Sequence, residues 1–176
     1  MKIDRNQTAA LVVDYQTKLM PVMRDREALL KRSCILLEGL KELQIPMYIT
    51  QQYTKGLGMS EPEIYEAAGT SEYEEKISYS AFDVVKDKLA GKKQVIVCGI
   101  EAHICVLQTV LDLLENGYEV FLVCDCISTR KELDMKYALK RARDAGAVLT
   151  TYESILFELL GKAGTDEAKV IQKLIR

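Results

Sequence analysis

The sequence predicts an α/β protein with three layers, α/β/α, around a doubly wound, mostly parallel sheet of six strands. Two observations support this. Short β-branched runs alternate with longer segments of helical periodicity, and the runs are apolar on both faces, as Leu11, Val12 and Val13 illustrate. Strands at this spacing are joined by right-handed helical crossovers, which make them parallel. The expected strand order is 3-2-1-4-5-6, a Rossmann-like arrangement.

The elements follow in order along the chain. Strand-like runs cover residues 8–14, 46–50, 73–77, 94–99, 118–124 and 147–150. Helical patterns cover residues 26–44, 81–90, 102–116, 131–145, 152–160 and 165–176. Glycines end three of these helices. The segment 51–80 holds Gly56, Gly58, Pro62 and Gly69 and is predicted to be the longest irregular segment, apart from a short strand around 73–77. No repeat or linker divides the chain, so residues 1–176 are expected to form a single domain.

Composition excludes several classes of function. The chain has 24 basic and 26 acidic residues, a net charge of −2 and a pI near 5.6, which argues against binding to nucleic acid or an anionic membrane. Five scattered cysteines and the lack of an export or membrane-spanning segment indicate a cytoplasmic protein. His103 is the single histidine, so metal sites built on several histidines are excluded, and no cofactor is expected.

Candidate catalytic residues lie where strands end. Parallel strands deliver their carboxyl ends to one edge of the sheet, so Asp14, after the first strand, should face Cys105, after the fourth. Cys105 falls in the first turn of a helix, where the backbone N–H groups should lower the pKa of its thiol. Asp14 is of the right type to take the thiol proton. The plainer alternative is a buried structural cysteine and a turn aspartate.

A zinc site is a second interpretation of the same edge. It would use His103, Cys105, Cys124 and Cys126, all placed near the ends of strands. Neither a C-x-x-C pair nor an H-x-x-x-H pair is present, so the sequence favours the interpretation without metal.

Three ordered motifs carry a family resemblance that spans roughly residues 8 to 160. They are the aspartate-bearing segment 11–21 (LVVDYQTKLMP), the lysine-bearing segment 75–82 (EKISYSAF) and the cysteine-bearing segment 98–109 (CGIEAHICVLQT). In these motifs the chain resembles the isochorismatase-like cysteine hydrolases, in particular their branch without metal. The histidines that hold a metal in nicotinamidases of this family have no counterpart in segment 50–58 (TQQYTKGLG).

The resemblance implies a catalytic triad of Asp14, Lys76 and Cys105. It also implies a cis peptide between Ile100 and Glu101, and an oxyanion hole made by the backbone N–H groups of Glu101 and Cys105. The remaining candidates, expected to bind substrate, are Tyr15, Gln16, Gln52, Tyr53 and Phe82.

The expected activity is hydrolysis of a C–N bond in a small amide or imide through a thioester on Cys105. Two alternatives stay open. Asp14 would act as a general acid on a vinyl ether, as in isochorismate hydrolysis, with Cys105 a bystander. Otherwise the chain would be a small-molecule-binding or regulatory oligomer without catalysis. The family also implies a homo-oligomer, either a dimer, a tetramer or a larger assembly.

Overall fold

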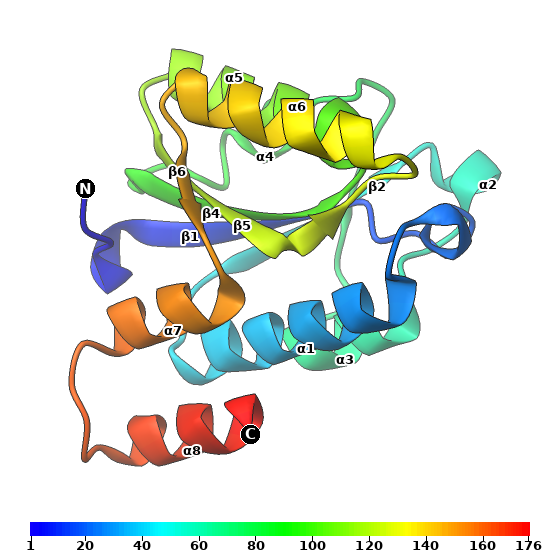
Figure 1. Ribbon diagram of the computed structural model, residues 1–176. Coiled ribbons are helices and arrows are strands. Elements are labelled where there is room, and N and C mark those ends of the chain that lie inside the picture. The colour runs from blue at the N-terminus through cyan, green and yellow to red at the C-terminus, as the bar shows by residue number, and fades with distance from the viewer.

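The computed structural model describes all 176 residues (Figure 1). Its sheet has six parallel strands in the order β3-β2-β1-β4-β5-β6, which confirms the predicted fold class and strand order. The strands are β1 (Thr8–Val13), β2 (Met47–Gln52), β3 (Glu74–Lys76), β4 (Gln94–Ile100), β5 (Glu119–Ser128) and β6 (Val148–Thr150).

Helices cover both faces of the sheet. The α-helices are α1 (Arg26–Glu42), α2 (Thr54–Leu57), α3 (Pro62–Ala68), α4 (Phe82–Val85), α5 (Leu107–Glu115), α6 (Glu132–Asp144), α7 (Tyr152–Leu160) and α8 (Asp166–Ile175). Figure 1 shows α4, α5 and α6 on one face and α1, α3, α7 and α8 on the other. Each layer has its own apolar core, one of 26 buried residues beside α1 and one of 19 beside α5.

The two central strands, β1 and β4, are buried along their whole length. Ala10, Val12 and Cys98 point toward the α1 layer, whereas Leu11 and Val13 point toward the α5 layer. A strand buried on both faces must be apolar throughout, which is why this pattern identified β1.

Four local expectations were wrong. Segment 51–80 is not largely irregular, because it contains α2 and α3. The helix predicted over 81–90 is α-helical only in α4, because the backbone hydrogen bonds beyond it mostly join residues three positions apart, as in a 3-10 helix. Strand β5 continues to Ser128, so Cys124 and Cys126 lie inside it. The first turn of the cysteine helix, Ala102–Val106, is π-helical.

Gly99 allows β1 and β4 to approach each other beside the predicted site. Its φ is +133°, and a Cβ atom on this residue would lie 2.1 Å from the carbonyl oxygen of Val13. Only glycine fits there. The next residue after Val13 is Asp14, whose φ of +53° turns the chain away from the strand.

None of the helices has both the length and the apolar character needed to cross a membrane.

Candidate active site

Three polar side chains meet beneath the surface at the carboxyl edge of the sheet. Asp14 follows β1, Lys76 ends β3 and Cys105 lies in the π-helical turn after β4. Their exposed fractions are 0%, 2% and 6%. The thiol of Cys105 is close enough to Asp14 and Lys76 for both charges to act on its pKa. The three residues that the resemblance named are therefore neighbours, although they are far apart in sequence.

The Asp14 carboxylate is held by two strands. The hydroxyl of Thr50, on β2, donates to Asp14 Oδ1 at 2.8 Å, and Lys76 Nζ lies 2.6 Å from Oδ2. Burial raises the pKa of this carboxyl, and the Lys76 charge opposes that effect. Sequence analysis missed Thr50, although its place at the end of the strand next to β1 offered a signal.

Lys76 is a buried ammonium surrounded by acceptors. Nζ forms an ion pair with the Asp14 carboxylate, and it donates to Gln52 Oε1 at 2.8 Å, to the Tyr79 carbonyl at 2.8 Å and to the Ser78 carbonyl at 3.4 Å. A buried charge is tolerated only when it is paired and hydrogen-bonded in this way. This cage fixes the ammonium next to the carboxylate and the thiol.

The expectation of a lowered thiol pKa at Cys105 is contradicted. Burial raises this pKa to about 12, and the Asp14 charge adds to the increase, while Lys76 opposes it. The partial charges of a helix start are smaller than these effects. Cys105 is therefore a neutral thiol at pH 7, and any reaction as a nucleophile requires a base that removes its proton during attack. Asp14 is the carboxylate in position to be that base.

The turn before Cys105 has an unusual backbone. The Ile100–Glu101 peptide is cis, and the Glu101 N–H donates no hydrogen bond within the protein. The Glu101 carboxylate accepts a bond of 2.9 Å from Arg130 Nε. The buried hydroxyl of Thr109 donates to the Cys105 carbonyl at 2.7 Å and accepts from the Ala81 N–H at 2.9 Å, which ties the cysteine turn to the segment after Lys76. Thr109 was also missed by sequence analysis.

Two residues expected to bind substrate have other roles. Tyr15 is fully buried in the core beside α1, where its hydroxyl bonds to Ser33 Oγ at 2.7 Å and to the Cys126 carbonyl. The Gln16 amide donates to the carbonyls of Gln52 and Gly58 and accepts from the Gln52 N–H. Because the chain turns at Asp14, these neighbours point into the protein rather than toward the thiol.

The other three substrate-binding candidates differ among themselves. Gln52 contacts the triad directly through Lys76, and its amide nitrogen donates to the Ile77 carbonyl at 2.6 Å. Tyr53 is exposed at the surface, and Phe82 is half-buried, with its ring edge-to-face against Tyr118. None of the cavities in the structure is lined by Asp14, Lys76 or Cys105.

The zinc interpretation fails on placement. Cys126 is buried in the core beside α1, whereas Cys105 belongs to the core beside α5, so the sheet lies between them. His103 instead places Nε2 at 3.7 Å from Asp134 Oδ2 on α6. No group of three or more potential metal ligands is assembled anywhere in the chain.

Comparison with known proteins decides the family. The model of the isochorismatase domain matches residues 8–154, which include all three motifs. The chain belongs to the isochorismatase family. This agrees with the resemblance found in the sequence.

Solved structures of this isochorismatase-like fold extend the comparison. A protein of Caenorhabditis elegans named MAR1 ribonuclease is 36% identical, with a TM-score of 0.94, covering 99% of this chain and 92% of its own. YcaC from Pseudomonas aeruginosa, solved with hexane-2,5-diol and covalent acrylamide, is 28% identical, with a TM-score of 0.90 and coverages of 98% and 91%. YcaC from Escherichia coli, described as an octameric hydrolase of unknown specificity, is 27% identical, with a TM-score of 0.91 and coverages of 99% and 90%.

Proposed function

We propose that this isochorismatase-family chain hydrolyses a C–N bond in a small amide or imide, with Cys105 as nucleophile and Asp14 as general base. The observation that carries the proposal is the buried ion pair of 2.6 Å between Asp14 and Lys76 next to a neutral thiol. A carboxylate whose charge is compensated by a fixed ammonium is a base that can take up one proton and return it.

The acylation half follows from these positions. Asp14 takes the thiol proton while Sγ of Cys105 forms a bond to the substrate carbonyl carbon, and the negative charge moves to the carbonyl oxygen. Backbone N–H groups of Glu101 and Cys105 are the proposed donors to that oxygen, and each such donor typically contributes about 3–4 kcal/mol. The C–N bond then breaks, and the protonated Asp14 gives its proton to the leaving nitrogen.

The second half releases the acid. Asp14 takes a proton from a water molecule while the oxygen of that water attacks the thioester carbon. The C–S bond then breaks, and the proton on Asp14 returns to the Cys105 sulfur. Lys76 keeps its proton throughout and compensates the negative charge, which alternates between the carboxylate and the oxyanion. Covalent acrylamide in Pseudomonas aeruginosa YcaC supports a reactive nucleophile in this fold.

The name of the Caenorhabditis elegans protein makes RNA cleavage the second candidate. The net charge of −2 disfavours it here, because binding to a phosphate backbone depends on clustered basic residues. A short RNA therefore belongs beside amides, imides and a vinyl ether in a substrate screen. Turnover of the RNA with Cys105→Ala unchanged would refute the thioester mechanism.

Alkylation tests the base directly. Cys34 and Cys124 have thiol pKa values of about 11 and are half-buried, so on pKa and exposure alone both should react with acrylamide faster than Cys105. Because Asp14 takes up the thiol proton, we expect Cys105 to react first, as followed by peptide mass spectrometry at pH 7. Asp14→Asn should abolish that preference without changing the rates at Cys34 and Cys124. A reaction order that follows pKa and exposure would refute the proposal.

Two further proposals concern the oligomeric state and the cellular location of the protein. A homo-oligomer is proposed on the example of the octameric Escherichia coli YcaC, and light scattering after size-exclusion chromatography measures it. A cytoplasmic location is proposed because all five cysteines are free, which suits a reducing compartment.

A further inference from the structure

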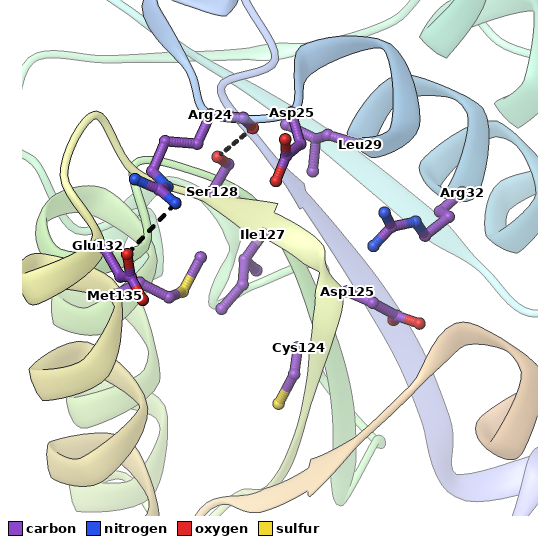
Figure 2. A pocket seen from close by; sticks show the side chains of 10 residues that line it. All are labelled: Arg24, Asp25, Leu29, Arg32, Cys124, Asp125, Ile127, Ser128, Glu132 and Met135. Atoms are coloured by element: carbon purple, nitrogen blue, oxygen red, sulfur yellow. Dashed lines mark hydrogen bonds and ion pairs between the residues drawn. The ribbon is translucent and has the colours of Figure 1, made fainter.

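A polar cavity lies beside the second half of β5, and none of the triad residues lines it. It has a volume of about 230 Å³ and is bounded by the start of α1, the second half of β5 and the start of α6. Strand β6 pairs only with Phe121–Val123, so the following residues of β5 have no strand on this side and form the floor. Figure 2 shows the cavity and its lining side chains.

Two lining side chains of opposite charge have no partner. Arg32, half-buried on α1, makes no ion pair or side-chain hydrogen bond, and in Figure 2 its guanidinium extends toward the centre of the cavity. Asp25 is the N-cap residue of α1, yet its carboxylate makes no capping bond to the helix and in Figure 2 points toward the same space. The two side chains are not paired with each other.

The rest of the lining distinguishes this cavity from a simple anion site. Arg24, the other guanidinium, is already paired with Glu132 at 3.5 Å. The lining carries two guanidinium groups and three carboxylates, of which Asp125 accepts from the Tyr152 N–H at 2.9 Å and Glu132 is the partner of Arg24. The lining charges without a partner in the protein are therefore Arg32 and Asp25, and Leu29, Ile127 and Met135 supply apolar surface. A ligand that satisfies the wall needs a carboxylate for the guanidinium, a cationic nitrogen for the carboxylate, and an apolar part.

We propose that this cavity binds a small zwitterion of the amino-acid class, with its carboxylate on Arg32, its ammonium on Asp25 and an apolar side chain on β5. The volume supports this size, because sites for larger, drug-sized ligands span roughly 300–1,000 Å³. The cavity is distinct from the triad, although Ser128, on its wall, pairs in the sheet with Ile100, next to the cysteine turn.

Three matched probes separate the charges of the ligand. L-Leucine carries both, L-leucinamide lacks the carboxylate, and 4-methylpentanoate lacks the ammonium. Titration calorimetry with the full chain should show saturable binding of leucine below about 10 mM. Each charge-assisted bond contributes a factor of roughly 10 to 100 in affinity, so both single-charge probes should bind at least tenfold more weakly than leucine.

Variants locate the site. Arg32→Gln and Asp25→Asn should each weaken leucine binding tenfold or more. Lys31→Gln, a matched charge removal one residue away on the exposed side of α1, should leave it unchanged. Thermal unfolding without ligand verifies that each variant is folded, and the two cavity variants serve as independent tests if one is unstable.

Several results would overturn the inference. No saturable leucine binding below about 10 mM excludes the class of ligand. Equal affinity for leucine and 4-methylpentanoate, with Asp25→Asn unchanged, would show an anion site instead. Binding that survives Arg32→Gln places the ligand elsewhere. Because Asp14 and Cys105 do not line the cavity, Cys105→Ala should retain leucine binding, so this proposal and the hydrolase proposal fail separately.

Discussion

The buried pair of Lys76 and Asp14 makes a single substitution, Lys76→Met, especially informative. At 2.6 Å and an effective dielectric constant of about 20, the two charges attract by about 6 kcal/mol. Part of that attraction offsets the cost of burying the ammonium, which methionine avoids. Removal of one partner of a buried pair typically costs about 3–5 kcal/mol, because the other charge stays buried alone. For a chain of this length, that loss lowers Tm by roughly 6–20 °C.

A matched control comes from the same segment of the chain. Lys86 pairs with Asp83 at 3.0 Å, but the two side chains are 50% and 76% exposed. Surface pairs of this kind contribute about 0–1 kcal/mol. Lys86→Met removes the same charge and introduces the same side chain, so the difference between the two variants isolates the effect of burial.

The loss in Lys76→Met should depend on pH. Burial raises the pKa of Asp14 in the folded protein, and without the Lys76 charge this pKa rises further. A group whose folded pKa is raised favours the folded state below its unfolded pKa, which is about 3.9 for aspartate. That contribution disappears as the pH rises through the folded pKa. The variant should therefore be closest to the wild type in acid and lose most stability at pH 8.

Urea unfolding of both variants and the wild type at pH 5 and pH 8 measures these differences. We expect a loss of about 3–5 kcal/mol for Lys76→Met at pH 8, a smaller loss at pH 5, and at most about 1 kcal/mol for Lys86→Met at both. An equal loss in the two lysine variants, or a Lys76→Met loss that does not change with pH, would show that the buried ion pair does not have the energetics argued from its geometry.

Two further substitutions test the residues that position Asp14. Gly99→Ala should lower the free energy of unfolding by about 2–6 kcal/mol, because its Cβ would clash with the Val13 carbonyl at an unfavourable φ. Gly91→Ala, with a φ of +80° and no atom within 4 Å, measures the strain alone and should cost less in the same unfolding assay. Thr50→Val removes a bond that lowers the pKa of Asp14, so the acidic limb of the pH profile of Cys105 alkylation should move to higher pH; an unmoved limb would contradict this role.

The buried parallel strands, and the placing of Asp14 and Cys105 at one edge of the sheet, were predictable for a physical reason. Strands buried on both faces must be apolar along their whole length, and parallel strands deliver their carboxyl ends to one edge. Helix α3 was missed although Pro62 at its first position and Gly69 after its end are both helix signals. They were interpreted as helix breakers instead, because Gly56 and Gly58 precede them in the same segment.

The side-chain directions at the site were not predictable from local pattern. Lys76 lies in an acidic, polar run that is typical of a solvated surface. It is buried because its partner, Asp14, lies 62 positions earlier in the chain, just after β1. Tyr15 and Gln16 follow Asp14 directly, yet the turn at Asp14 sends them into the protein. The thiol pKa was mispredicted for the same reason, since the burial and the Asp14 charge around Cys105 arise only from the assembled fold.

The central place of β1 also has a consequence for the order of folding during synthesis. One edge of β1 pairs with β2, but the other pairs with β4, which begins at Gln94. At ordinary rates of translation, that edge stays unpaired for on the order of ten seconds after β1 is made. An apolar strand with an open edge is a site for mispairing, so the strand that leads into Asp14 is exposed to this hazard until β4 is made.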